Sequence, residues 1–272
     1  MPSFFQNRPT SSASSVEPQH TDVPELRLAE LAAVYYGQRM GGDFYDFIRV
    51  SPNRVLFGLL DVAGRHEDSR PIIAAAQQTF RRAAAEAFSH EEVNEANALV
   101  DLCLEINRTI LRAAGGVRSC PAFTGCYHED LGTVCYVNAG HTPALLRHST
   151  GITEVGATGL PFGLFSHATC DAPTIAVEPN AALLLVSRGV VEAKHKGNEF
   201  GLDGVKKSLQ KINAENAREV CVGVLSDVKD FMRTPPTHND VTALAIEHDP
   251  AGVKYRQHRI SSDARGDDAF GI

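Results

Sequence analysis

The order of its hydrophobic periodicities is the feature that most limits how this 272-residue chain can fold. Runs rich in β-branched and aromatic residues at 44–50 and 55–61 bracket a Ser-Pro-Asn-Arg turn and predict a β-hairpin. Two helical stretches follow, at 69–88 and after Ser89, and strand-like segments return after the glycine pair at 115–116. Strands, then helices, then strands with antiparallel connections indicate an α+β fold rather than a doubly wound α/β fold.

The remaining elements are predicted from the same local patterns. Segment 26–36 mixes helix-favouring residues with partial alternation, and we predict a strand. The second helix is predicted to begin with a capping box at 89–92 (Ser-His-Glu-Glu) and to bury a stripe formed by Val93, Ala96, Val100, Cys103, Asn107 and Ile110. Further strands are predicted at 122–128, 133–138, 144–148, 174–177, 182–187 and 241–247, and further helices near 202–212 and 217–232.

Composition indicates one folded domain with two tails. With 43% apolar and 22% charged residues the chain can bury one large core. The first stretch is rich in Ser, Thr, Pro and Gln, and the last is charged and poor in large apolar residues. We therefore predict a disordered segment at 1–24, a folded domain at 25–248 and a disordered tail at 249–272.

Charge and cysteine usage exclude several classes of function. The 26 Lys and Arg against 33 Asp and Glu give a net charge of −7 without a dense basic stretch, which argues against nucleic acid as a partner. No segment has the apolar length of a signal peptide or a membrane span, so we expect a cytoplasmic protein that does not act at a membrane. The six cysteines include no Cys-x-x-Cys pair and are expected to be buried reduced thiols.

Two carboxylates mark the ends of the predicted hairpin. Asp43 lies in a Gly-Gly-Asp-Phe-Tyr-Asp segment at 41–46, and Asp61 ends the apolar run 55–60. The hairpin would bring Asp43 and Asp61 side by side at one end of a sheet. Because adjacent carboxylates repel unless a cation lies between them, a site for Mg²⁺ or Mn²⁺ is one hypothesis. A surface turn, a helix cap or a salt bridge is the alternative.

Seven segments in a fixed order resemble a known family. They are 41–46, 61–64 (Asp-Val-Ala-Gly), 138–143 (Asn-Ala-Gly-His-Thr-Pro), 159–164 (Gly-Leu-Pro-Phe-Gly-Leu), 184–193 (Leu-Leu-Val-Ser-Arg-Gly-Val-Val-Glu-Ala), 200–201 (Phe-Gly) and 239–242 (Asn-Asp-Val-Thr). In these segments, from about residue 26 to 247, the chain is similar to the stage II sporulation protein E branch of the metal-dependent (PPM) protein serine/threonine phosphatases.

The resemblance implies a fold and a chemistry. The fold would be a sandwich of two antiparallel β-sheets flanked by α-helices. At one end, two Mn²⁺ or Mg²⁺ ions would lower the pKa of a water molecule that attacks phosphoserine or phosphothreonine, so that no cysteine or serine nucleophile is needed. In this branch the usual substrate is a phosphorylated anti-sigma-factor antagonist in a partner-switching pathway.

Carried over by position, the resemblance assigns metal-site roles and identifies two departures. Asp61 would bridge the two metals, the carbonyl of Val62 would bind one of them, and Asp43 would order metal-bound water, which makes Asp43 and Asp61 the catalytic residues. A metal carboxylate of the family falls on Arg188, and a second falls on Asn239. Arg188 could pair with Asp61 or Asp43 and fill the space of a metal, because its planar guanidinium suits carboxylate geometry.

Three further residues bear on this site. Asp240 is a candidate substitute for the lost carboxylate at 239, although neighbours in an extended segment point to opposite faces. Segment 64–66 reads Gly-Arg-His where the family has Gly-His-Gly, which would put bulk beside the metal cleft. His66 and His141 could act as new ligands, or as structural or exposed histidines.

Two functions follow from these residues. One is a PPM-type phosphatase that hydrolyses phosphoserine or phosphothreonine on a regulatory protein with impaired metal binding, using one ion or none. The alternative is a catalytically inactive pseudophosphatase that acts as a protein-binding module in a partner-switching pathway.

Overall fold

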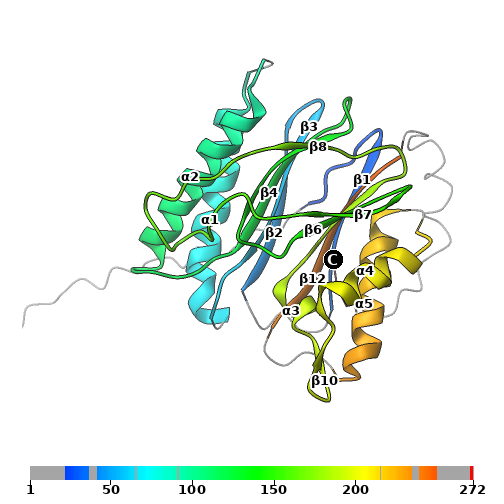
Figure 1. Ribbon diagram of the computed structural model, residues 1–272. Coiled ribbons are helices and arrows are strands. Elements are labelled where there is room, and N and C mark those ends of the chain that lie inside the picture. The colour runs from blue at the N-terminus through cyan, green and yellow to red at the C-terminus, as the bar shows by residue number, and fades with distance from the viewer. Residues whose placement is uncertain are drawn as a thin grey trace, which may run out of the picture.

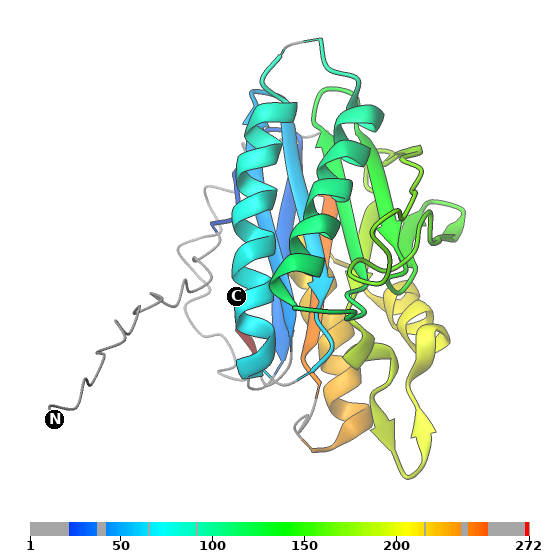
Figure 2. The same cartoon turned by 90° about the vertical axis from the view of Figure 1, so that its left-hand side faces the viewer.

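The computed structural model describes residues 22–36, 42–64, 66–90, 92–214, 216–234, 239–249 and 270–271. Two antiparallel sheets lie face to face, and helices cover both outer faces (Figures 1 and 2). This is the predicted α+β sandwich.

The first sheet has six strands in the order β13-β1-β12-β9-β6-β7. Their bounds are β1 Ala29–Tyr36, β6 Ala144–His148, β7 Gly151–Val155, β9 Ala182–Val186, β12 Val241–His248 and β13 Phe270–Gly271. The second sheet has five strands in the order β2-β3-β4-β5-β8. Their bounds are β2 Asp43–Ser51, β3 Arg54–Asp61, β4 Ala122–His128, β5 Thr133–Ala139 and β8 Thr174–Ala176.

Two helix pairs cover the sheets. The helices α1 (His66–Ala87) and α2 (Glu95–Ala113) lie on the outer face of the second sheet, and α4 (Gly201–Lys211) and α5 (Ala217–Met232) lie on the outer face of the first (Figure 1). A short helix α3 (Arg188–Val191) follows β9, and β10 (Lys194–His195) pairs with β11 (Asn198–Glu199).

The core consists of three apolar layers, and strand alternation assigns residues to them. On β3, Phe57 and Leu59 pack between the two sheets, whereas Leu56 and Leu60 pack under α1 and α2. The third layer lies between the first sheet and α5, with Val220 as one of its fully buried members. Because side chains alternate across a strand, one apolar run serves two layers and fixes the register of β2 and β3.

The start of α2 differs from its prediction. Asn94 caps this helix, and its side chain accepts a hydrogen bond from the backbone N of Asn97 at 3.0 Å. Ser89, predicted as the cap, donates its hydroxyl to the carbonyl of Glu86 instead, at 2.9 Å. The buried stripe therefore consists of Ala98, Leu99, Leu102, Cys103, Ile106, Asn107 and Ile110. Of the predicted stripe, Cys103, Asn107 and Ile110 belong to this buried face, because the helix begins later than the capping pattern indicated.

The termini and some short elements complete the comparison. Sequence patterns did not predict β7, α3, β10 or β11, each of which is five residues or fewer. Two residues of the segment for which we predicted a disordered tail, Phe270 and Gly271, pair with Tyr36 and Tyr35 of β1. Residues 1–21, 250–269 and 272 lie outside the described residues. Within the described ranges, no helix is both long and apolar enough to cross a membrane.

Candidate active site

The two hairpin carboxylates meet at one end of the second sheet, as predicted. Asp43 and Asp61 are register partners on β2 and β3, and the backbone N of Val62 donates to the carbonyl of Gly42 at 3.0 Å. A Cβ at Gly42 would overlap the carbonyl oxygen of Val62, so this close approach requires glycine. Gly41 lies outside the described residues.

The first sheet closes the site from the other side. Thr242 donates its hydroxyl to Oδ2 of Asp43 at 2.8 Å, and the backbone N of Asp43 donates to Oδ2 of Asp240 at 3.1 Å. The hydroxyl of Ser187 donates to the carbonyl of Asp240 at 3.1 Å, and its oxygen accepts a hydrogen bond from the backbone N of Thr242 at the same distance. These bonds join the start of β12 to the end of β9 and hold Asp43 between the sheets.

Asp240 lies in the site, contrary to the alternation argument. Its side chain is buried, with 4% exposure, and it lines the same pocket as the exposed Asn239. The reason is that β12 begins at Val241, so residues 239 and 240 precede the regular strand and need not alternate. The pocket encloses about 310 Å³, part of it open to solvent, and is lined by Gly42, Asp43, Asp61, Val62, Gly64, Arg188, Gly189, Asn239 and Asp240.

Arg188 and Asn239, the two positions that depart from the family pattern, both contact carboxylates at the site. Nε of Arg188 lies 3.3 Å from Oδ2 of Asp61 and 4.0 Å from Oε2 of Glu192. Asn239 donates its side-chain amide to Glu192 at 3.4 Å. A Cβ at Gly189 would overlap the carbonyl oxygen of Asp240, so the start of α3 is packed tightly against the residue that precedes β12. The expected pairing of Arg188 with Asp61 is present.

Burial and mutual repulsion perturb the acids of the pocket. Burial, followed by the nearby carboxylates of Asp61 and Asp240, raises the pKa of Asp43 well above its ordinary value. Burial also raises the pKa of Asp61, against the opposing effect of the Arg188 guanidinium. Three carboxyl groups therefore share the pocket, their burial and mutual repulsion favour the neutral form of Asp43, and Arg188 is the cation in contact with Asp61.

A two-metal centre does not fit these residues. Across the described part of the chain, no group of three or more His, Cys, Asp or Glu side chains is arranged to hold a metal ion. The carboxylate that would bridge two ions, on Asp61, is paired with the guanidinium of Arg188. The position of Asn239 supplies an amide that donates to Glu192 and carries no charge. Two divalent ions would need carboxylate ligands at positions 188 and 239. The chain has a guanidinium at one of these positions and a neutral amide at the other.

The two histidines predicted as alternative ligands are His141 and His66. His141 is buried outside the residues that line the pocket, with Nδ1 3.0 Å from the carbonyl of Thr142, and burial lowers its pKa to about 4. Its backbone N donates to the side chain of Asn138 at 2.8 Å, which favours the structural role. Arg65 and the side chain of His66 lie outside the described residues, so the predicted bulk at 64–66 stays a prediction.

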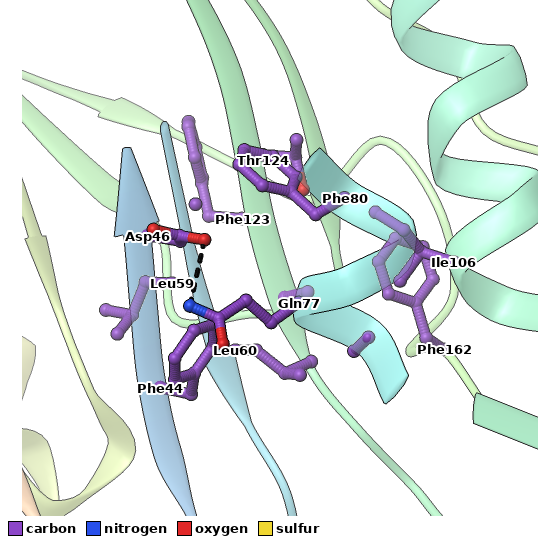
Figure 3. A pocket seen from close by; sticks show the side chains of 13 residues that line it. Phe44, Asp46, Leu59, Leu60, Gln77, Phe80, Ile106, Phe123, Thr124 and Phe162 are labelled. Carbon is purple, nitrogen blue, oxygen red and sulfur yellow. Dashed lines mark hydrogen bonds between the residues drawn. The ribbon is translucent and has the colours of Figure 1, made fainter. Parts of the chain in front are cut away.

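The second carboxylate of segment 41–46 serves packing. Asp46 is buried on the face of β2 turned toward α1, where it accepts two bonds from the guanidinium of Arg81, at 2.8 and 3.0 Å. Gln77 donates to the same carboxylate at 3.2 Å, at the edge of an apolar pocket of about 360 Å³ between the sheet and the helices (Figure 3). Asp46 therefore anchors α1 to β2 and is not part of the candidate site.

Arg118 is a residue beside the site that sequence reasoning missed. Its Nη1 donates to the carbonyl of Ala63 at 3.0 Å and would lie 2.8 Å from a Cβ at Gly64, which lines the pocket. No local pattern marks this contact, because the two partners are 55 residues apart in sequence.

Sequence comparison identifies a family and two similar proteins. The family model described as "Stage II sporulation protein E (SpoIIE)" matches residues 51–249, more than two thirds of the chain. Protein IcfG of Synechocystis sp. is 22% identical over 203 residues, which are 65% of this chain and 31% of that protein. Phosphoserine phosphatase RsbP of Bacillus subtilis is 26% identical over 165 residues, which are 58% of this chain and 39% of that protein. The chain thus spans about a third of the length of these relatives.

A solved structure shares the fold. The RsbU and RsbW domains of Rv1364c from Mycobacterium tuberculosis superpose with a TM-score of 0.68 at 20% identity, covering 84% of this chain and 62% of that one. At this identity the likeness concerns the fold of the two sheets and their helices.

Proposed function

Because the chain belongs to the stage II sporulation protein E family of PPM-type phosphatase domains, we propose that its pocket binds a phosphorylated regulatory protein without metal-dependent hydrolysis. The bound group is a phosphoserine or phosphothreonine, and the guanidinium of Arg188 contacts it where a metal ion would otherwise lie. The partner class we propose is a phosphorylated anti-sigma-factor antagonist of a partner-switching pathway.

The contact between Arg188 and Asp61 carries this proposal. Nε faces Asp61, and within the described residues the ion-pair partners of Arg188 are Asp61 and Glu192. Its side chain is 47% exposed in an open pocket, so the remaining N–H groups can reach a ligand. A guanidinium presents a planar fork of donors that matches two phosphate oxygens, which makes arginine well suited to bind phosphate without a metal.

The charge of the pocket is compatible with an anion at its mouth. The raised pKa of Asp43 reduces the negative charge that an incoming phosphate meets, and Arg188 offsets the charge of Asp61. Arg118 adds a second guanidinium next to Gly64 at the pocket rim.

A second candidate is a phosphatase with impaired binding of Mn²⁺ or Mg²⁺, using one ion. The observation in its favour is that Asp43, Asp61 and Asp240 line one pocket and that two of them have raised pKa values. A divalent cation would relieve this repulsion and, when bound, would supply electrostatic stabilisation to phosphoryl oxygens. It would have to displace Arg188 from Asp61 first.

Fluorescence anisotropy can separate the two candidates. The probe is a fluorescein-labelled twelve-residue peptide with a central phosphoserine between leucines, compared with its unphosphorylated form in EDTA. We expect phosphate-dependent binding in EDTA that weakens about 10-fold to 100-fold in Arg188→Ala, the loss typical of a charge-assisted hydrogen-bond pair. Arg218→Ala, an exposed arginine in the first turn of α5, is the control. Equal affinity for the two peptides would overturn the proposal, and cleavage that requires Mn²⁺ would favour the second candidate.

A further inference from the structure

We propose that Val117, Arg118, Leu160 and Phe165 form a docking surface for the chain that flanks the phosphorylated residue. This inference rests on the proposed function and adds the chemistry of the partner. The surface selects a phosphorylated segment that has large apolar side chains next to the phosphoresidue. Arg118 pairs with the negative charge of the phosphate.

The docking surface stands on a rigid pair of segments. The backbone N of Cys120 donates to the carbonyl of Phe162 at 2.9 Å, and the reverse bond is 3.1 Å long. Arg118 donates its backbone N to the carbonyl of Gly163 at 3.1 Å. Gly163 has a φ of 79°, and a Cβ there would overlap the carbonyl of Arg118, so the two segments approach as closely as glycine allows.

A buried asparagine of α2 fixes the second segment. Asn107 is 1% exposed. Its side-chain oxygen accepts a hydrogen bond from the backbone N of Gly163 at 2.7 Å, and its side-chain nitrogen donates to the carbonyl of Phe165 at 2.9 Å. The first segment is joined to the site itself, because the backbone N of Asp61 donates to the carbonyl of Pro121 at 2.9 Å. The docking surface is therefore held at a set position relative to Asp61.

Exposed apolar side chains gather on these segments. Val117 is 76% exposed, Phe165 57% and Leu160 52%, and the described residues contain one other large apolar side chain of comparable exposure, Leu131. Leu131 lies in the turn between β4 and β5, at the end of the sheet away from Asp61. Three of the four such side chains thus lie on these two paired segments, and a grouping of exposed apolar side chains is typical of an interaction surface.

Arg118 indicates what covers this surface. Its guanidinium is seated against Gly64, whose φ of 127° and missing side chain leave room for it. Within the described part of the chain no carboxylate forms an ion pair with Arg118, in contrast to Arg54, Arg81 and Arg82. An unpaired cation at the rim of a phosphate pocket, next to exposed apolar side chains, complements a segment that carries a phosphate beside apolar residues.

Two phosphopeptides test the inference by anisotropy, one with leucines on both sides of the phosphoserine and one with glutamines. We expect the wild-type protein to bind the leucine peptide about 10-fold more tightly, as burial of one large apolar side chain predicts. Phe165→Ser should abolish this preference. Arg118→Gln should weaken binding of both phosphopeptides about 10-fold and reduce its dependence on salt. Leu131→Ser and Arg218→Gln are the matched controls and should match the wild-type protein.

The outcomes separate this inference from the function beneath it. If Phe165→Ser keeps the leucine preference, or Arg118→Gln binds as the wild-type protein does, the docking surface is wrong, whereas phosphate-dependent binding lost in Arg188→Ala would still support the proposed function. If the wild-type protein does not distinguish phosphorylated from unphosphorylated peptide, the proposed function fails and the inference with it. A dimer on gel filtration that Phe165→Ser dissolves would assign the surface to a second copy of the chain and overturn the inference.

Discussion

Replacing Arg188 and Asn239 by aspartate should convert the pocket into a metal-binding site. The double variant Arg188→Asp with Asn239→Asp removes the guanidinium that lies 3.3 Å from Asp61 and adds two carboxylates to a pocket that already holds three. The physical reason is charge, because hard divalent cations bind to clusters of carboxylate oxygens.

The size of the effect follows from Coulomb's law. Two unit charges 4 Å apart interact by about 1 kcal/mol at the dielectric constant of water, so a two-unit change beside a divalent ion is worth ~4 kcal/mol. Arg188 has a 47% exposed side chain, so salt and solvent screening discount this value. A gain of about 2–3 kcal/mol, or ~100-fold in the Kd for Mn²⁺, is the expected result for Arg188→Asp. Asn239→Asp, a one-unit change, should add about 10-fold.

Calorimetric titration of Mn²⁺ at two salt concentrations measures this gain in both single variants and the double variant. Arg218→Asp is the charge-matched control, since it makes the same two-unit change at the N-terminal end of α5, where a carboxylate is tolerated. The gain should shrink at high salt. If the double variant binds Mn²⁺ no more tightly than Arg218→Asp does, the assignment of positions 188 and 239 to the metal site is wrong.

Three further predictions concern stability and are measured by urea unfolding. Gly58→Ala should stabilise the protein by about 0.5–1 kcal/mol, because its Cβ would face the apolar pocket at 3.4 Å from the nearest atom. Gly125→Ala should destabilise the protein, because its Cβ would overlap the buried ring of Phe57. Equal changes in the free energy of unfolding for the two variants would contradict this prediction. Arg81→Ala should cost about 2–4 kcal/mol by leaving the buried carboxylate of Asp46 without its cation, and a loss below that of an exposed salt bridge would refute the anchoring role. The pKa of His141 is lowered to about 4, so its contribution to the free energy of unfolding is complete above the unfolded pKa of 6.5 and is lost as the pH falls toward 4. The contribution is worth about 3 kcal/mol in all. His141→Gln should flatten that part of the stability profile against pH, and an unchanged slope would contradict the prediction.

Local sequence patterns predicted the elements that depend on local chemistry. The hairpin of β2 and β3, and with it the pairing of Asp43 with Asp61, follows from two runs rich in β-branched and aromatic residues around a proline turn. The helix α5 was predicted at its observed bounds, because its apolar spacing is regular and uninterrupted.

What the sequence did not reveal depends on contacts between distant segments. Asp240 enters the pocket because residues 239 and 240 precede the strand, whose start at Val241 was predicted, so the alternation argument did not apply to them. The start of α2 at Asn94 was missed because Ser89 has an equally good capping pattern, and the structure uses that hydroxyl to end α1. The contact of Arg118 with Ala63 joins two loops that only the packed sandwich brings together.

The replacement of a metal ion by Arg188 is tested most directly by calorimetric titration of Mn²⁺ into the wild-type protein, beside its hydrolysis of p-nitrophenyl phosphate, with Asp61→Ala as the reference. Because Arg188 holds the carboxylate that a metal would need, we expect Mn²⁺ binding too weak to saturate over the range that saturates the double variant, and no Mn²⁺-dependent turnover above that of Asp61→Ala. Saturable binding together with turnover, both lost in Asp61→Ala, would contradict this expectation and establish a metal-dependent phosphatase.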